Sequence, residues 1–131
     1  MDKMNTIELI GYLVIVLKII VAVSMLNVWL LQAHKATKWR GGNATSIIAE
    51  FEVYGLSKQF CYFVGFLKIS FAILLLASLK FESLTLISSI GLTILLLGSV
   101  AMHVKVKDVL YKSFPAALFI AMNLIILYSA L

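Results

Sequence analysis

Two lysines lie deep inside long apolar stretches of this chain, Lys18 in the first stretch and Lys68 in the second. A lysine at the centre of a bilayer costs about 2.5–3.5 kcal/mol on insertion scales, so each ammonium needs a partner or a function. Glu50 or Glu52 could reach Lys68, either as a structural ion pair or within a functional site. No acid of the chain is expected at the depth of Lys18. That ammonium would then be neutral, hydrated, or paired with an anionic ligand or another subunit.

A second group of charged residues surrounds the Gly-Gly-Asn turn at positions 41–43. It comprises Lys38, Arg40, His103, Lys105 and Lys107. Turn amides together with cations form anion-binding concavities. We expect a lipid phosphate there, with a polar substrate or a quinone headgroup as the alternative.

The remaining chemistry-bearing residues complete no familiar set. Cys61 is the single cysteine, and His34 and His103 are the only histidines. Neither a Glu-x-x-His sequence nor a second cysteine is present, so the sequence predicts no metal or haem site. A phosphate loop, a serine-nucleophile elbow and a nucleic-acid motif are also missing, and no catalytic residue can be assigned.

The composition indicates what must hold these residues. The chain has 131 residues, of which 63% are hydrophobic and 13% are charged, against about 45–50% and about 25% in soluble domains. The net charge of +5 comes mainly from cations between the apolar stretches. It therefore favours membrane orientation and contact with anionic lipid over binding of nucleic acid.

The hydrophobic pattern predicts an all-α integral membrane four-helix bundle that forms one domain over residues 1–131. The expected spans are about 7–31, 60–79, 84–102 and 114–131. Each is long enough, at 1.5 Å per residue, to cross or nearly cross a hydrocarbon core of about 30 Å.

Between the first two spans, residues 46–54 are predicted to form a short amphipathic helix. Its apolar residues recur at one-face helical spacing: Ile47, Ile48, Phe51 and Tyr54. Thr45 or Ser46 could cap its start, and Gly55 could end it. This helix would lie in the interface or fold against the bundle mouth, where it could bring Glu50 or Glu52 to Lys68.

The distribution of basic residues predicts the orientation. One side carries Lys35, Lys38, Arg40, Lys58, Lys105, Lys107 and Lys112, whereas the other carries only Lys3 and Lys80. The positive-inside rule places the connectors 32–59 and 103–113 in the cytoplasm and both termini outside.

Several segments resemble the DoxX-like family of small four-span bacterial membrane proteins: RGGNATS, EFEVYGLS, VGFLKISFAILLL, AMHVKVKD and KSFPA. The proline that usually follows the Lys-Asp pair is Val109 here, which leaves the end of the third helix open. The resemblance implies a four-helix bundle in the bacterial inner membrane. The family takes its name from a subunit associated with a thiosulfate–quinone oxidoreductase, which makes quinone the cofactor to consider.

Three functions follow as hypotheses. The first is an accessory or binding subunit, not expected to be an enzyme on its own, with a polar pocket lined by Arg40, Glu50, Lys68, His103 and Lys107. The second is a quinone-linked oxidoreductase component with Lys18, Lys68 and His103 near the headgroup. The third is a structural subunit or homo-oligomer whose buried lysines meet acids on a membrane neighbour.

Overall fold

The computed structural model describes residues 5–131, and every regular element in that range is helical. The elements are α1 (Thr6–Leu26), the π-helical turn η1 (Asn27–Leu31), α2 (Ile47–Val53), α3 (Lys58–Ala77), α4 (Leu84–Lys105), the 3₁₀ turn η2 (Leu110–Ser113) and α5 (Phe114–Ser129). Among the described residues, four segments are long and apolar enough to cross a membrane: α1 with η1, α3, α4, and η2 with α5. The predicted all-α membrane bundle is confirmed. Lys3 and the first part of the predicted domain lie outside the described residues.

Three helices begin at polar side chains that cap them. Asn5 starts α1, Ser46 starts α2 and Ser57 starts α3, each accepting a hydrogen bond from the amide three residues later at 2.8–3.1 Å. Such a cap satisfies one of the amides that the first helical turn leaves free. Ser57 therefore starts α3 at Lys58, two residues before the predicted boundary.

The predicted connector helix is present as α2. Ser46, not Thr45, supplies its cap, and Gly55 follows it with φ of 80°. Glycine adopts this left-handed conformation at little cost.

The sequence leaves the end of the third helix open, and the structure places it. The helix α4 runs to Lys105, three residues beyond the expected span, and Lys107 then adopts φ of 58°. The amide of Asp108 donates to the carbonyl of His103 at 3.0 Å, and the amide of Lys107 donates to that of Val104 at 3.1 Å. This pattern is a Schellman motif, which turns the chain back toward the last turn of the helix.

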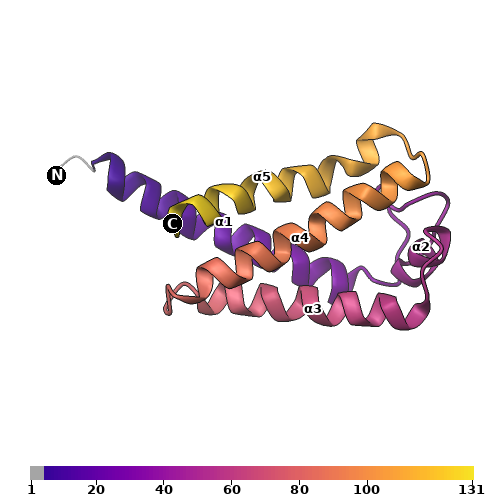
Figure 1. Ribbon diagram of the computed structural model, residues 1–131, viewed down its shortest axis with the longest axis horizontal. Coiled ribbons are helices and arrows are strands. Elements are labelled where there is room, and N and C mark those ends of the chain that lie inside the picture. The colour runs from indigo at the N-terminus through magenta and orange to yellow at the C-terminus, as the bar shows by residue number, and fades with distance from the viewer. Residues whose placement is uncertain (1–4) are drawn as a thin grey trace.

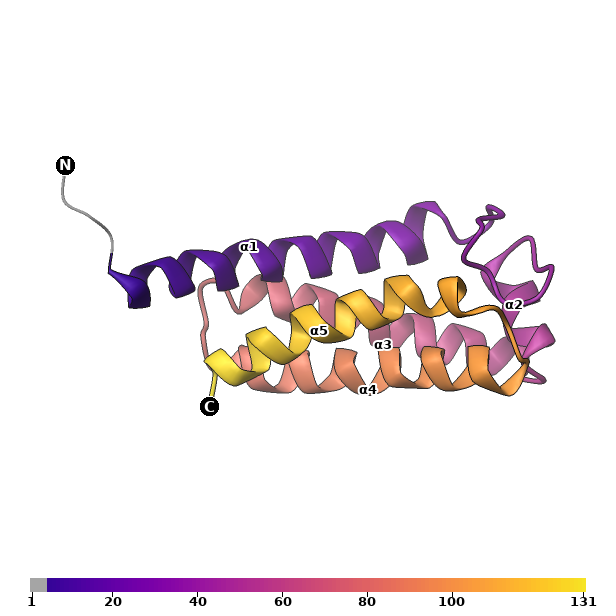
Figure 2. The same ribbon diagram turned by 90° about the horizontal axis from the view of Figure 1, so that it is seen from above.

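The four long helices lie side by side and alternate in direction (Figures 1 and 2). α4 packs against α3 and α5, and α1 packs against the same two helices. The first turns of α1 extend past one end of the bundle, and α2 lies at the other end (Figure 2). We call the end that holds α2 the connector end and the end that holds the α3–α4 loop the far end.

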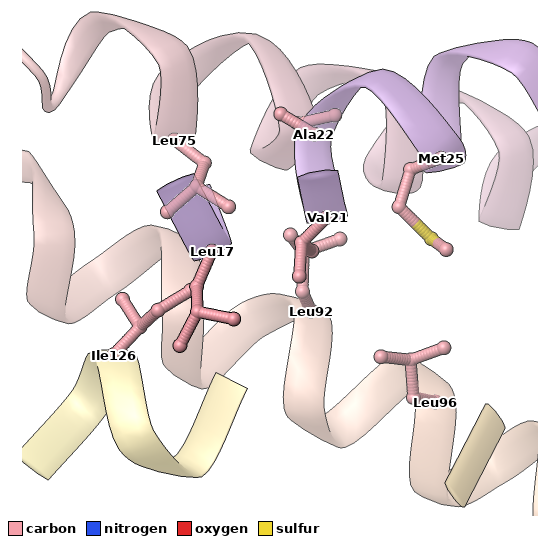
Figure 3. Close-up of a cluster of buried hydrophobic side chains, with 9 residues drawn as sticks. Leu17, Val21, Ala22, Met25, Leu75, Leu92, Leu96 and Ile126 are labelled. Carbon is pink, nitrogen blue, oxygen red and sulfur yellow. The ribbon is translucent and has the colours of Figure 1, made fainter. Parts of the chain in front are cut away.

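A hydrophobic core occupies the middle of the bundle (Figure 3). Its buried members are Leu17, Val21, Ala22, Met25, Ala72, Leu75, Leu92, Leu96 and Ile126. On α3, Ala72 and Leu75 follow Lys68 toward the far end. The core therefore separates Lys68 at the connector end from the α3–α4 loop at the far end.

The outward surface of the spans is also apolar. Phe66 is 68% exposed, Ile94 is 62% exposed and Val23 is 52% exposed. Contiguous apolar surface of this kind is costly in water and is covered by lipid in a membrane. The exposed faces therefore agree with a multi-pass membrane protein.

Candidate functional site

Lys68 projects from α3 into the connector half of the bundle and is 8% exposed. Its Nζ donates one hydrogen bond, to Oγ of Ser99 on α4 at 3.2 Å. The same atom lies 5.5 Å from the ring centroid of Trp29, within the range of a cation–π contact. Within residues 5–131 no carboxylate pairs with it, so the expected ion pair with Glu50 or Glu52 does not form.

Trp29 is held beside Lys68 by an irregular helix and a glycine. The π-helical turn at the end of the first span changes the direction in which its side chains point. The ring packs on Gly65 of α3, where an added Cβ would lie 2.7 Å from Cε3 of the indole. Trp29 thus forms part of an internal wall and is half-buried, although its place near the end of a span is typical of interfacial tryptophan.

An apolar cavity of about 280 Å³ lies beside Lys68, between η1, α2, α3 and α4. Its walls are mainly apolar side chains, among them Val28, Ile47, Phe51, Leu56, Phe60, Val64, Leu95 and Met102. Among the described residues, its polar lining comprises Arg40, Glu50, Tyr54, Lys68, Ser99 and the indole of Trp29. A mostly apolar cavity with a few convergent polar groups is the usual form of a small-molecule site.

A second cavity, of about 510 Å³, lies on the other side of Lys68 between α1 with η1, the connector, α4 and α5. We call it the charged cavity. Its polar lining includes Asn27, Gln32, Lys38, Arg40, Glu50, Lys68, Ser99, His103 and Lys112. Because Lys68, Ser99, Arg40 and Glu50 line both cavities, the Lys68 ammonium stands at their shared boundary.

Arg40 and Glu50 hold the connector over these cavities. Arg40 is 7% exposed, and its Nη2 donates to the carbonyl of Gln32 at 2.7 Å. Oε2 of Glu50 accepts a hydrogen bond from the amide of Gly41 at 2.8 Å. The next amide, that of Gly42, donates to Oδ1 of Asp108 at 3.0 Å. Carboxylates of the chain itself therefore occupy the turn amides, and the expected lipid-phosphate site at this turn is not open.

Asp108 is the residue that joins the connector to the end of α4. Its Oδ2 lies 2.7 Å from Nδ1 of His103, and its Oδ1 lies 3.6 Å from Nζ of Lys112. Burial alone would raise the pKa of Asp108, but the hydrogen bonds from His103 and Gly42 and the charge of Lys112 hold it below its usual value. The sequence interpretation missed this role. The sequence held one indication of this role, an acid five residues after His103. The Schellman turn brings residues with that spacing into contact.

Tyr54 connects α2 to the same cluster. Its ring makes an edge contact with the imidazole of His103, with centroids 5.8 Å apart, and Nζ of Lys105 donates to its carbonyl at 2.8 Å. Burial, together with the nearby Glu50 carboxylate, raises the pKa of the Tyr54 hydroxyl well above its usual value. The phenol therefore stays neutral.

Lys18 forms a different kind of site at the far end. It is 2% exposed, and its Nζ donates to Oγ1 of Thr85 at 2.9 Å, to Oε2 of Glu82 at 3.3 Å and to the carbonyl of Ser78 at 3.4 Å. The expectation that no acid of the chain reaches Lys18 was wrong. The flexible side chain carries the ammonium toward the α3–α4 loop. A comparison of backbone depths along the helices does not include this reach of the side chain. A hollow of about 840 Å³ borders Lys18, but the three N–H groups already have acceptors.

The other predicted site residues lie outside the cavities. Glu52 and Lys107 are exposed and line neither cavity, and His34 is exposed as expected. Arg40, Glu50, Lys68 and His103, with Lys38 in the charged cavity, are therefore the predicted residues that the fold brings together, and Lys18 is far from them along the bundle. Trp29, Tyr54, Ser99 and Asp108 join the site only through tertiary contacts.

These features define the class of protein: a four-span helical membrane protein with adjoining cavities at its connector end. The family model described as the DoxX-like family matches residues 16–126, and the chain belongs to this family. The matched range contains both buried lysines and the whole connector. No curated protein and no solved structure matches the chain.

Proposed function

We propose that this protein is a membrane-embedded binding subunit for an amphiphilic molecule with a hydrogen-bond-accepting headgroup. The observation that carries the proposal is the buried Lys68 ammonium. It stands between two cavities and, within residues 5–131, makes one hydrogen bond, to Ser99. An ammonium carries three N–H donors, so two are left for a ligand oxygen. Leaving such a donor buried without a partner costs about 1–3 kcal/mol, which a bound acceptor would offset.

The apolar cavity supports an apolar body for this ligand. Ile94 lines the cavity and is also 62% exposed on the outer surface of α4. The cavity therefore reaches the surface that lipid would cover, and a ligand could enter sideways from the bilayer. A cavity of about 280 Å³ takes a headgroup and the first part of a chain. The rest of a long chain would remain among lipid tails.

A quinone-linked redox component is the second candidate. A quinone carbonyl is an acceptor of the required kind, and the aromatic side chains of Trp29, Phe51 and Phe60 line the apolar cavity. Cys61 is the single cysteine, so the chain has no thiol pair to supply electrons. In this case the electrons would come from a partner protein, and the chain would bind the quinone.

The structural-subunit hypothesis loses one of its supports. It needs acids on a neighbouring subunit for both buried lysines, but Glu82 of the same chain provides the acid for Lys18. A membrane partner or a homo-oligomer stays a proposal that rests on the exposed apolar faces and on Lys68, which pairs with no carboxylate among residues 5–131.

For orientation, we propose that the connector end faces the cytoplasm of a bacterial inner membrane. Within the described residues that end carries seven basic side chains, whereas Lys80 is the basic residue of the α3–α4 loop. An alkaline phosphatase fused after Leu131 should be active in intact cells, because this enzyme works outside the cytoplasm. Fluorescence from a green fluorescent protein fused at the same position, together with an inactive phosphatase fusion, would reverse the orientation.

The test of the binding function replaces Lys68 with Met in protein purified in detergent. A Trp39→Phe background leaves Trp29, at the cavity wall, as the fluorescent reporter. Dodecanoate and a decyl-substituted benzoquinone serve as probes. We expect both to change Trp29 fluorescence saturably, and Lys68→Met to weaken binding about tenfold or more, which corresponds to about 1.4 kcal/mol.

Lys80→Met is the matched control, because Lys80 is an exposed lysine in the far-end loop. It should leave both affinities unchanged. Binding of the quinone alone would favour the redox candidate. Equal affinities for wild type and Lys68→Met, or no saturable binding of either probe, would contradict the proposed function.

A further inference from the structure

The imidazole of His103 is held in one tautomer by Asp108. The carboxylate of Asp108 also accepts a hydrogen bond from the amide of Gly42, and its lowered pKa keeps it ionised, so it acts only as an acceptor. Nδ1 of His103, 2.7 Å away, must therefore be the donor. When the ring is neutral, its other nitrogen, Nε2, carries a lone pair.

Nε2 is free to meet a ligand. His103 lines the charged cavity, and Nε2 has no hydrogen-bond partner among residues 5–131. Part of the surface of Nε2 also stays accessible, since Nε2 is not among the enclosed polar atoms without a partner in that range. A base whose second nitrogen is oriented by a carboxylate is the arrangement that proton-accepting histidines use in many sites.

His103 and Lys68 face the same space. Ser99, which bonds to the Lys68 ammonium, lies one helical turn before His103 on the same face of α4. Both His103 and Lys68 line the charged cavity. One headgroup of modest size can therefore reach both groups.

The charges around His103 favour an oxyanion in this space. Lys68 faces the cavity from α3, Arg40 and Lys38 from the connector, and Lys112 from η2. The facing acids are Glu50 of α2 and Asp108, and both already bind backbone amides. Tyr54, which packs on the imidazole, is neutral. Cations therefore outnumber acids at the place where a negative charge would form.

We propose that the ligand headgroup carries an acidic hydroxyl, such as a phenol, whose proton passes to Nε2 of His103. The O–H bond breaks and an Nε2–H bond forms, while the electron pair stays on the oxygen. The resulting oxyanion accepts a hydrogen bond from the Lys68 ammonium, and Asp108 stabilises the imidazolium. The step needs no oxidant or further reactant. It rests on the proposed function, because it specifies the headgroup of the same ligand.

The experiment uses 2-octyl-4-nitrophenol, whose phenolate absorbs at a longer wavelength than the phenol. Its binding is followed by Trp29 fluorescence in the Trp39→Phe background, and its ionisation by absorbance over a range of pH. In the wild-type cavity the bound probe should be half ionised at a pH lower, by about one unit or more, than in protein-free micelles. His103→Gln should raise the half-ionisation pH of the bound probe by about one unit or more, and His34→Gln should not.

A second measurement needs no substitution of His103. Below the pH at which the free probe ionises, formation of bound phenolate should release no net proton, because His103 keeps it. Calorimetry in buffers of different ionisation enthalpy measures the number of protons released for each phenolate that forms. Release of about one proton per phenolate, a bound probe that stays neutral, or an unchanged half-ionisation pH in His103→Gln would each overturn the inference and leave the binding function standing. Failure of the probe to bind would overturn both.

Discussion

Lys18 and Lys68 are two buried lysines in one small bundle, and they have opposite surroundings. The ammonium of Lys18 has an acceptor for each of its three N–H groups, including the carboxylate of Glu82. The ammonium of Lys68 has one hydroxyl acceptor and the face of Trp29, and it borders two cavities. The hydrophobic core of Figure 3 lies between the two ends of the bundle.

Burial of a lysine therefore does not by itself indicate a functional residue. What differs is the number of donors that the fold leaves unused. An ammonium with a full set of acceptors stabilises the packing of helices and loops. Removing either partner of such a hydrogen bond leaves the other buried and unpaired. An ammonium with unused donors beside an apolar cavity is arranged to meet a ligand.

Replacing Lys18 with Met should cost the most stability. The change leaves the buried oxygens of Thr85 and Ser78 without their donor, so the free energy of unfolding should fall by about 2–4 kcal/mol. Lys68→Met loses one hydrogen bond but also removes a desolvated charge, so it should stay within about 1 kcal/mol of wild type. Reversible unfolding in detergent, followed by circular dichroism, compares the two. Equal losses of unfolding free energy in Lys18→Met and Lys68→Met would contradict the distinction between a structural and a binding lysine.

The next effect concerns the wall that holds Trp29 beside Lys68. Gly65→Ala would place a Cβ 2.7 Å from the indole, and such overpacking costs about 1–3 kcal/mol. The displaced ring should also change its fluorescence maximum in the Trp39→Phe background. Gly11→Ala is the matched control, since a Cβ there meets nothing within 4 Å, and in a helix it should be neutral or slightly stabilising. A stable Gly65→Ala protein with unshifted Trp29 emission would show that this packing does not hold the ring.

A smaller effect is expected at Asp108. Its pKa is lowered in the folded protein from about 3.9 in an unfolded chain, so its ionised form stabilises the fold. That contribution is complete above about pH 3.9 and is lost as the pH falls through the folded pKa. Asp108→Asn should cost about 1–2 kcal/mol at neutral pH, since an amide still accepts from Gly42 but no longer pairs with Lys112. It should also flatten the fall of the melting temperature as the pH drops below about 4. A variant with the wild-type acid profile would argue against Asp108 as the group that titrates.

The smallest effect should follow Glu82→Gln. The Glu82 side chain is 72% exposed, so solvent screens its attraction for Lys18, and exposed pairs contribute at most about 1 kcal/mol. The difference between wild type and variant should shrink further in high salt. A loss as large as that of Lys18→Met would mean that the carboxylate alone, and not the set of three acceptors, holds the ammonium.

Several local elements of the fold could be read from the sequence. The spans follow from runs of apolar residues, and the connector helix follows from a one-face stripe between Ser46 and Gly55. The end of α4 could not be placed in the same way. A lysine at the left-handed position of a Schellman motif has no strong sequence signal, because glycine is the usual residue there.

The candidate site was predictable in part. Lys68, Arg40, Glu50 and His103 were singled out by charge in apolar or turn surroundings. The fold brings the first three to both cavities and His103 to the charged cavity. Which atoms pair could not be predicted. Glu50 binds the amide of Gly41 instead of Lys68, because a backbone amide of the same connector is the nearer donor.

The all-helical membrane bundle follows from the sequence alone, because hydrophobic runs and caps act over a few neighbouring residues. The sequence also shows which polar groups would be costly to bury. That Lys18 has a full set of acceptors and Lys68 does not becomes visible only in the folded chain, because a hydrogen bond depends on atoms within about 3 Å. The partners here come from other helices: Thr85 lies 67 positions after Lys18 in the chain, and Ser99 lies 31 positions after Lys68.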